Sequence, residues 1–254
     1  MELGLTGGVA LITGGGGGIG RATALALAAE GVKVAVLDLD ATLAKATAEQ
    51  IAAGGGDAIA IPTDVTEEIS VKNAVEAIVD TWGGVDYLIL CAGISGLYGK
   101  TIEEIEVSEW DQLFAVNVKG QWLPCKFALP HLRNSNRASI SIVASDSALV
   151  GSPLHVPYCA SKGAVLMFTK ALSVDLREDG IRVNCVCPSI VDTPMPRADL
   201  GLAENWSSTV DYPVHRPEDI ARYLTLLASP ATASINGHPL VADFGYLAQS
   251  GFPA

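Results

Sequence analysis

Positive charge is scarce in this sequence. Its 254 residues contain 16 lysines and arginines against 28 aspartates and glutamates, which gives a formal net charge of −12. No run of basic residues is present, and both nucleic acids and anionic membranes favour clustered lysine and arginine. The charge balance therefore argues against nucleic-acid and membrane partners, and we expect a small-molecule substrate.

Cysteine is also rare. Five residues are present, namely Cys91, Cys125, Cys159, Cys185 and Cys187, and they show no metal-binding spacing. The last two would share one face of a strand, so a metal pair is conceivable, but core packing is the favoured interpretation and no metal site is predicted. An odd number of cysteines in apolar surroundings is typical of reduced thiols, which predicts a cytoplasmic protein.

Long apolar segments are missing as well. The first residues carry no basic stretch, and the apolar run that follows breaks into glycines at Gly14. We therefore expect neither a signal peptide nor a membrane span. No repeat or linker divides the chain, and its length suits a single α/β domain over residues 1–254.

The chain does contain a strand, a glycine-rich loop and a helix in immediate succession. Residues 9–13 are an apolar run, residues 14–20 are glycine except for Ile19, and residues 21–30 are strong helix formers. Such a loop lets the backbone approach a pyrophosphate, whose charge the helix start attracts. A flexible linker is the alternative, but a linker would lack the flanking strand and helix.

The second strand, residues 32–37, ends at Asp38, which lies 18 residues beyond Gly20. An acidic side chain at this place accepts hydrogen bonds from ribose hydroxyls and repels a 2′-phosphate. The sequence therefore predicts NAD rather than NADP as the cofactor.

Strands and helices alternate along the rest of the chain. Further strands are expected at 58–61, 86–90, 139–144, 181–186 and 239–242, and helices at 42–52, 67–82, 110–132, 156–178 and 217–228. This rhythm predicts a doubly wound parallel sheet with helices on both faces. We expect Pro124 and Pro130 to bend or interrupt the helix that contains them. Residues 190–215, with one short helix over 198–205, are predicted to form a substrate lid.

Tyr158 and Lys162 are separated by four residues and follow Pro157, which suits the first turn of a helix. On a helix this spacing places the phenol and the ammonium on one face. The ammonium and a cationic cofactor together would favour the phenolate and make Tyr158 a base near neutral pH. Such a pair also occurs by chance on exposed helix faces. Ser145 follows strand 139–144, at the sheet edge where ligands bind.

Together these motifs make the chain similar to the short-chain dehydrogenase/reductase family over essentially its whole length. The resemblance rests on features in the family's order: Thr13-Gly14-x-x-x-Gly18-Ile19-Gly20, Asp38, Asp64-Val65, Ala92-Gly93, Asn117, Ser145, Tyr158-x-x-x-Lys162 and Pro188-x-x-Val191-x-Thr193. It implies a Rossmann-like sheet of about seven strands. It also implies a catalytic tetrad of Asn117, Ser145, Tyr158 and Lys162.

In this tetrad Ser145 would bind the substrate oxygen and Tyr158 would exchange the hydroxyl proton. Lys162 would hold the nicotinamide ribose and lower the pKa of Tyr158, and Asn117 would support a proton-relaying water. By the same resemblance, the cofactor contacts would be Gly14, Gly18, Ile19, Gly20, Asp38, Asp64, Val65, Cys91, Ala92, Gly93, Tyr158, Lys162, Val191 and Thr193. Cys91 stands where the family usually has Asn, and Ser189 replaces the usual Gly, so the central strand must be supported differently.

The side chains expected to face the substrate are mostly apolar. They are Ser145, Ser147, Leu149, His155, Tyr158, Ile190 and Met195, surrounded by Ile94, Leu97, Leu200, Leu202 and Trp206. No arginine or lysine obviously enters, which disfavours carboxylate or phosphate substrates. We therefore predict an NAD-dependent oxidoreductase of a hydrophobic secondary alcohol, such as a cyclic, terpenoid or aryl one. His155 is either a second acid–base group or, as favoured, a pocket wall or a surface histidine.

Several alternatives stay open. A reductase of 3-oxoacyl groups on an acidic carrier protein would be expected to show a basic patch, and a sugar epimerase or dehydratase a longer substrate domain. A polyol or sugar dehydrogenase of the same fold is a further alternative. A silent NAD-binding scaffold would lack one of the three reacting side chains, which are all present. The resemblance also implies a homotetramer joined through long helices and the apolar segments 244–247 and 252–254.

Overall fold

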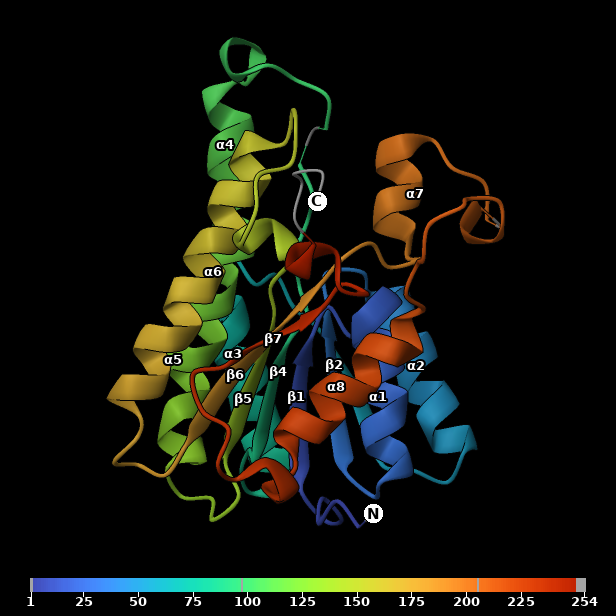
Figure 1. Cartoon of the computed structure of the whole chain (residues 1–254). Helices are drawn as coiled ribbons and strands as arrows, with labels where there is room; N and C mark the ends of the chain where they lie inside the picture. Colours follow the sequence, from blue (N-terminus) through green and yellow to red (C-terminus); the bar gives the residue numbers. More distant parts are fainter. Residues whose placement is uncertain (1, 97, 205, 250–254) are drawn as a thin grey trace.

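Seven parallel strands form one sheet in the computed structural model, which describes residues 2–96, 98–204 and 206–249. The strands are β1 (Val9–Thr13), β2 (Lys33–Asp38), β3 (Ala58–Pro62), β4 (Tyr87–Leu90), β5 (Ser139–Val143), β6 (Arg182–Pro188) and β7 (Pro239–Ala242). Their order across the sheet is β3-β2-β1-β4-β5-β6-β7 (Figure 1). The predicted doubly wound parallel sheet is confirmed.

The winding of the sheet reverses at β1. The chain moves outward from β1 through β2 to β3 and then returns to place β4 on the other side of β1. Thr13 is paired with Leu37 on one side and with Leu90 on the other. Ligands of open α/β sheets bind in the crevice that such a reversal leaves outside the carboxyl ends of the strands.

Helices cover both faces of the sheet (Figure 1). The helices are α1 (Gly18–Ala29), α2 (Ala41–Ala53), α3 (Glu68–Trp82), α4 (Val107–Phe114), α5 (Gly120–Leu132), α6 (Val156–Asp175), α7 (Pro194–Leu200) and α8 (Pro217–Ala228). Side chains of α1, α2 and α8 pack with Ala10 and Ile12, whereas those of α3, α5 and α6 pack with Val9 and Leu11. Alternate residues of a strand point to opposite faces, so a fully buried strand such as β1 is apolar throughout.

The predicted interruption of the helix by its prolines is wrong. The helical path runs from α4 through a wider π turn at Ala115–Lys119 into α5, which contains both Pro124 and Pro130. A proline ring crowds the carbonyl four residues earlier, and for Pro124 this is Gly120, where the π turn ends. The irregularity of the helix therefore lies before the prolines, around Asn117.

The segment predicted as a lid has its short helix earlier than expected, at α7 rather than over 198–205. Pro194 suits the first turn of a helix, and Gly201, with a φ of 62°, ends it. Asp192 holds this segment together because its carboxylate accepts hydrogen bonds from Arg197 Nε (2.8 Å), Trp206 Nε1 (2.9 Å) and Ser207 Oγ (2.6 Å).

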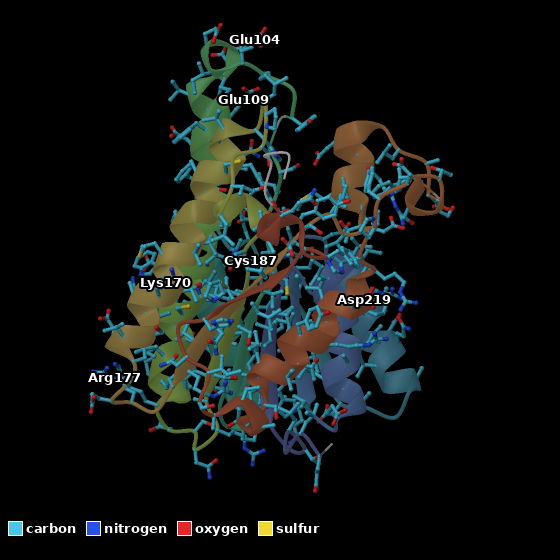
Figure 2. The ribbon with its side chains drawn as sticks, viewed as in Figure 1. Glu104, Glu109, Lys170, Arg177, Cys187 and Asp219 are labelled. Carbon is cyan, nitrogen blue, oxygen red and sulfur yellow. The ribbon has the colours of Figure 1, made fainter. Side chains whose placement is uncertain are left out.

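The cysteines lie apart from any metal-like cluster. Figure 2 shows Cys187 inside the molecule, with Lys170 and Arg177 on α6 and beyond its end, toward the outside. Within the three described ranges, no group of three or more histidine, cysteine, aspartate or glutamate side chains is arranged to hold a metal ion. The same ranges contain no helix that is both long and apolar enough to span a membrane.

Candidate active site

The predicted reacting groups meet at the carboxyl end of β5. This strand ends at Val143, and two residues later Ser145 starts a loop that leads to α6. Tyr158 and Lys162 stand on the first turns of α6, with Pro157 beside the helix start. Lys162 is buried, and its Nζ donates to the carbonyl of Val143 at 3.0 Å. The same Nζ lies 5.6 Å from the centre of the Tyr158 ring.

Burial dominates the electrostatics of this pair. It raises the pKa of Tyr158 to about 12, against a lowering by contact with Ser145, and the carboxylates of Asp146 and Asp199 raise it further. Burial likewise lowers the pKa of Lys162 to about 8. The protein groups alone thus shift the pKa of the phenol in the opposite direction to the sequence-based expectation, because burial disfavours the charged phenolate.

Ser145 is buried, and its hydroxyl is already engaged. Ser145 Oγ donates to Asp146 Oδ1 at 3.0 Å and accepts from the backbone N–H of Ser147 at 3.1 Å. The only proton of this hydroxyl therefore points to a carboxylate. To donate to a substrate oxygen, Ser145 must turn that proton away from Asp146.

Asn117 lies in the π turn and has no exposed surface. Its Oδ1 accepts from Ile94 N (2.8 Å), and its Nδ2 donates to Ile94 O (2.8 Å) and Ser161 Oγ (3.1 Å). The expected partner of the amide is thus a backbone segment after β4 together with α6. This side chain ties three parts of the site together.

The glycine loop forms a cradle that larger residues would fill. A Cβ on Gly14, whose φ is 65°, would lie 2.9 Å from the backbone of Ala92, and one on Gly20 would lie 2.0 Å from Gly14 O. Gly17 caps α1 without a side-chain hydrogen bond, and the first turn has no acidic residue. Open N–H groups at a helix start, with room beside them, fit a pyrophosphate.

The other predicted cofactor residues border this cradle. Asp38 Oδ2 accepts from Gly16 N at 2.9 Å, so its carboxylate lies against the loop. Thr193 lies against Gly18, because a Cβ on that glycine would be 3.2 Å from Thr193 Cγ2. Val191, which is buried, precedes Thr193 and forms a bridge to His215.

Asp64 and Val65 follow β3 at the same edge of the sheet. Asp64 Oδ1 accepts from both Thr66 N (2.9 Å) and Thr66 Oγ1 (2.7 Å), which closes a local turn. Val65 packs on Gly120, where a Cβ would lie 2.8 Å from Val65 Cγ2. These contacts fix the wall of the cradle on the side of α5.

The departure at Cys91 is compensated by a residue that sequence reasoning missed. Gln121 Nε2 donates to Ala92 O at 2.6 Å, and Thr13 Oγ1 accepts from Ala92 N at 3.3 Å. Burial raises the pKa of the Cys91 thiol to about 12, so it stays neutral. The available signal was a glutamine four residues after Asn117, so that both amides share one face of the helical path. Gly93 lies beside Asn117, with a Cβ position 3.4 Å from Oδ1.

His155 stacks directly on the catalytic candidate Tyr158. The ring centres are 4.4 Å apart with an interplanar angle of 7°, and Tyr98 meets the histidine edge-on at 5.2 Å. His155 Nε2 lies 3.2 Å from Ser95 O. Burial lowers the pKa of this histidine, opposed by the bond to Ser95 and the charge of Asp199. The lowered pKa favours the neutral imidazole in this stack, and a role as a pocket wall stays a prediction.

The remaining predicted substrate residues differ in exposure. Leu149 is exposed, Ile190 and Met195 are half-buried, and Ser147 is buried, with its Oγ 3.2 Å from Ser152 Oγ. Trp206 is buried, and its Nε1 donates to Asp192 within the segment 190–215. Leu97 lies outside the described residues.

Comparison with known proteins agrees with this geometry. The family model described as short chain dehydrogenase matches residues 8–200. The chain is 36% identical over 250 residues to a 2-(S)-hydroxypropyl-CoM dehydrogenase of Xanthobacter autotrophicus, covering 94% of this chain and 96% of the relative. It is 34% identical over 244 residues to a cyclopentanol dehydrogenase of a Comamonas species, covering 94% and 97%.

Among solved structures, a 3-ketoacyl-(acyl-carrier-protein) reductase from Brucella melitensis complexed with NADH superimposes with a TM-score of 0.86 at 34% identity. The match covers 95% of this chain and 98% of that one. The matched family model, the whole-length relatives and the shared sheet lead to one conclusion. This chain belongs to the short-chain dehydrogenase/reductase family.

Proposed function

We propose that this protein is an NAD-dependent oxidoreductase that interconverts a secondary alcohol and its ketone. The observation that carries the proposal is the meeting of Ser145, Tyr158 and Lys162 at the carboxyl end of β5, beside the glycine cradle. Two of the relatives are dehydrogenases of alcohols, and one structural neighbour holds NADH. Burial of Ser145 and Lys162 keeps water away from the reacting groups.

When bound, the oxidised nicotinamide supplies a hydride acceptor and a positive charge. In the proposed mechanism Ser145 Oγ holds the substrate oxygen, and Tyr158 Oη takes the hydroxyl proton during oxidation and returns it during reduction. Lys162 holds the ribose of the cofactor and stabilises the phenolate. Asn117 acts through its contacts, because it fixes the segment at Ile94 and the helix at Ser161.

We assign the cofactor contacts to the residues around the cradle. Gly14, Gly18, Ile19 and Gly20 would hold the pyrophosphate, and Asp38 the adenosine ribose. The other proposed contacts are Asp64, Val65, Cys91, Ala92, Gly93, Val191 and Thr193. The half-buried carboxylate of Asp38, already seated on Gly16 N, disfavours a 2′-phosphate and supports NAD.

Replacing Asp38 with serine is expected to relax this preference. The variant loses the repulsion of the 2′-phosphate, so kcat/KM for NADP should rise about tenfold or more relative to that for NAD. Initial rates with both cofactors at one alcohol concentration measure the ratio. Asp57→Ser, which changes a carboxylate just before the start of the neighbouring strand β3, at the opposite edge of the sheet, serves as the control. An unchanged ratio for Asp38→Ser would mean that another group reads the ribose.

The alternatives predict different surfaces. An acyl-carrier substrate calls for a basic docking patch, and the net charge of −12 disfavours it. The silent scaffold is disfavoured by the intact site. The substrate is proposed to have a hydrophobic body, cyclic, terpenoid or aryl. Leu149, Ile190 and Met195 follow the carboxyl ends of the neighbouring strands β5 and β6, and all three are apolar and at least partly exposed.

The test is a spectrophotometric screen at 340 nm with NAD and secondary alcohols, from aliphatic through aryl to bicyclic and steroid alcohols. We expect turnover with bulky apolar alcohols. If no alcohol reduces NAD while the protein still binds NADH, the proposed reaction is wrong but the cofactor site remains. The five free cysteines support a cytoplasmic location as part of this proposal.

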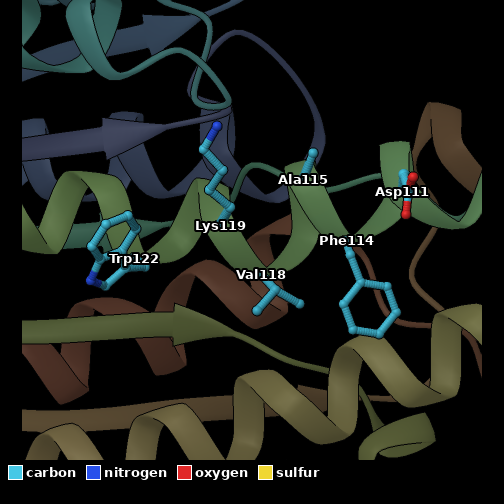
Figure 3. Close-up of a pocket in the computed structure, with 6 residues that line it drawn as sticks. All are labelled: Asp111, Phe114, Ala115, Val118, Lys119 and Trp122. Atoms are coloured by element: carbon cyan, nitrogen blue, oxygen red, sulfur yellow. The ribbon is translucent and has the colours of Figure 1, made fainter. Parts of the chain in front are cut away.

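We further propose that the protein is a homotetramer. A hollow with a volume of about 560 Å³ lies along α4, the π turn and the start of α5. Figure 3 shows the side chains that line it, which are Asp111, Phe114, Ala115, Val118, Lys119 and Trp122. Trp122 on α5, and Met167 and Val174 on α6, are exposed apolar side chains that a second copy would cover. The segment 252–254, also expected at the interface, lies outside the described residues.

Light scattering of the purified protein is expected to give four times the mass of the chain. Trp122→Glu would place a charge in the proposed contact and shift the mass toward smaller species. Leu39→Glu is the control. It changes an exposed apolar residue that directly follows β2, in the other half of the sheet from β5 and β6. A stable active monomer of the unchanged protein would rule the tetramer out.

A further inference from the structure

Two carboxylates stand beside the proposed reacting groups, and the proposed mechanism uses neither. Asp146 directly follows Ser145, and Asp199 lies on α7. Both are half-buried, and the negative charge of both acts on Tyr158. Because both charges disfavour the phenolate, we asked what else the two carboxylates could bind.

Asp146 competes with the substrate for the proton of Ser145. Its Oδ1 accepts from Ser145 Oγ at 3.0 Å and from Ser147 Oγ at 3.4 Å. Among the described hydrogen bonds of its side chain, Oδ2 takes no part. Oδ2 is therefore a second acceptor on the carboxylate that contacts Ser145, the residue proposed to hold the substrate oxygen.

Asp199 is connected to Tyr158 through Ser95 and His155. Its Oδ1 accepts from Ser95 Oγ at 2.8 Å, and the carbonyl of Ser95 contacts His155, whose ring stacks on Tyr158. Asp199 thus connects α7 to the wall of the site. Its described hydrogen bond, like those of Asp146, uses only Oδ1, so what distinguishes Asp146 is its direct contact with Ser145.

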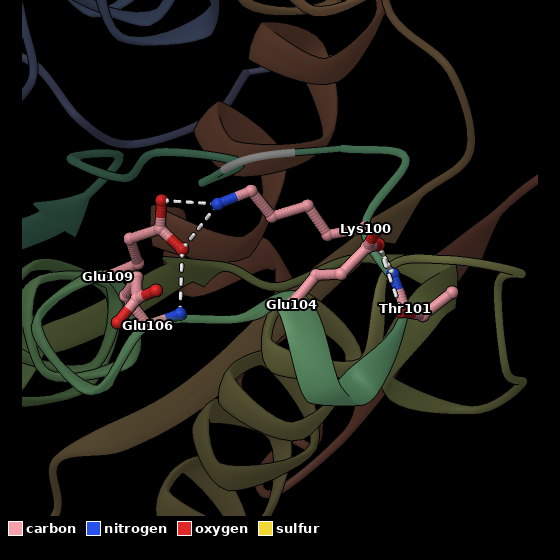
Figure 4. Close-up of polar contacts among 5 residues, drawn as sticks. All are labelled: Lys100, Thr101, Glu104, Glu106 and Glu109. Atoms are coloured by element: carbon pink, nitrogen blue, oxygen red, sulfur yellow. Dashed lines mark hydrogen bonds and ion pairs between the residues drawn. The ribbon is translucent and has the colours of Figure 1, made fainter.

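The cations of the flanking segments are engaged elsewhere. Lys100 Nζ contacts both oxygens of Glu109, at 2.7 and 2.8 Å (Figure 4). Arg197 is paired with Asp192 at 2.7 Å. Apart from Lys162, whose Nζ donates to Val143 O, the groups described here around Tyr158 are acceptors, which favours a substrate that brings hydrogen-bond donors.

We propose that the substrate is a vicinal diol, whose second hydroxyl donates to Asp146 while the first is oxidised. This proposal rests on the proposed function, which supplies the oxidised hydroxyl. The two oxygens of a gauche vicinal diol lie about one hydrogen-bond length apart. Ser145 Oγ and the carboxylate of Asp146 are neighbours, with 3.0 Å between Oγ and Oδ1, so adjacent hydroxyls can contact one group each.

The second hydroxyl also frees Ser145. When a substrate hydroxyl donates to Asp146, the carboxylate no longer needs the proton of Ser145, which then turns to the reacting oxygen. A monoalcohol lacks that donor, so Ser145 must leave Asp146 without compensation. The diol therefore gains both a charge-assisted hydrogen bond and a correctly oriented serine.

The experiment compares three cyclic substrates with NAD: cis-1,2-cyclohexanediol, cyclohexanol and 2-methoxycyclohexanol. The unchanged protein should show kcat/KM about ten- to a hundredfold higher for the diol than for the other two. The methoxy compound keeps the second oxygen but has a methyl group in place of its proton, and cyclohexanol is smaller than the diol. A low kcat/KM for both the larger and the smaller compound therefore separates hydrogen-bond donation from fit.

Asp146→Ala should reduce the ratio of diol to monoalcohol kcat/KM to within about threefold of one, and Asp146→Asn, which retains an acceptor, should restore part of it. Glu103→Ala removes an exposed carboxylate and should leave the ratio unchanged. Thermal melting of each variant shows whether it is folded, and Asp146→Asn provides the comparison if Asp146→Ala is not.

The outcomes separate the two levels of proposal. The diol assignment is wrong if the unchanged protein oxidises the diol and cyclohexanol equally well, or if Asp146→Ala lowers kcat/KM for these two by the same factor. The proposed oxidoreductase function then stands. If 2-aminocyclohexanol exceeds the diol, the donor is an ammonium and the assigned hydroxyl is wrong. If none of these compounds reduces NAD, nor any in the wider screen, the proposed function itself fails.

Discussion

Tyr158→Phe is expected to bind NADH as tightly as the unchanged protein and to lose at least about a thousandfold in kcat. The substitution removes only the phenolic oxygen. The ring keeps its stack on His155 and its place above Lys162, so the walls of the site persist. What disappears is the group proposed to take the hydroxyl proton.

Two measurements together give this prediction its force. Fluorescence titration with NADH checks that the cofactor site is intact, and initial rates at 340 nm report turnover. Tyr98→Phe is a matched control, because that phenol belongs to a ring that also contacts His155 but has no place in the proposed proton transfer. Tyr158→Phe with more than a tenth of the original rate would contradict the mechanism.

The pH dependence of turnover has a direction that follows from burial. The protein groups alone raise the pKa of Tyr158 to about 12, with burial the largest cause. The phenolate therefore needs the positive charges of Lys162 and the bound cofactor, and oxidation of an alcohol should accelerate as pH rises toward the phenol pKa in the complex.

The fold was predictable because its signals are local. The apolar runs, the glycine loop and the alternation with helices are each contained in a few neighbouring residues, and the strands appear within a few positions of the expected ranges. The strand order, with its reversal at β1, is not determined by this alternation and is seen only in the structure. The phenol and the ammonium were likewise predictable, since four residues on a helix determine that they share a face.

What the sequence could not show depends on contacts between distant segments. The π turn at Asn117 is stabilised by bonds to Ile94 and Ser161, and no local pattern indicates it. Gln121 supports Ala92 across 29 residues. The role of Asp146 depends on which way the hydroxyl of Ser145 points. The helix α7 begins at Pro194 rather than later because Asp192 binds Arg197, which pins its first turns.

Lys162→Met is expected to abolish turnover, with a loss of about a thousandfold, and at the same time to stabilise the fold. Lys162 is buried, and burial lowers its pKa from 10.5 to about 8. The folded protein thus holds this proton less tightly than the unfolded chain does. At pH 7 the buried ammonium costs about 3 kcal/mol relative to the neutral amine.

Methionine has nearly the same length and no charge. It removes that cost but also loses the bond from Nζ to Val143 O, which offsets about 1 kcal/mol. The net expectation is a gain of about 1–2 kcal/mol in the free energy of unfolding at pH 7, or an increase in Tm of a few degrees. Denaturant titration and thermal melting measure it, and Lys170→Met, on the exposed side of the same helix, should show little change.

The sign of the pH effect separates this explanation from better packing. Between the folded pKa of about 8 and the unfolded value of 10.5, the unfolded chain binds more protons, so the stability contributed by Lys162 rises with pH. Above that window the amine is neutral in both states and the cost is gone. The advantage of Lys162→Met should therefore shrink steadily from pH 8 to pH 10.5, whereas a gain from packing would stay constant. A constant advantage, or none at pH 7, would mean that the ammonium is solvated in the folded protein, and its proposed place beneath Tyr158 would have to be revised.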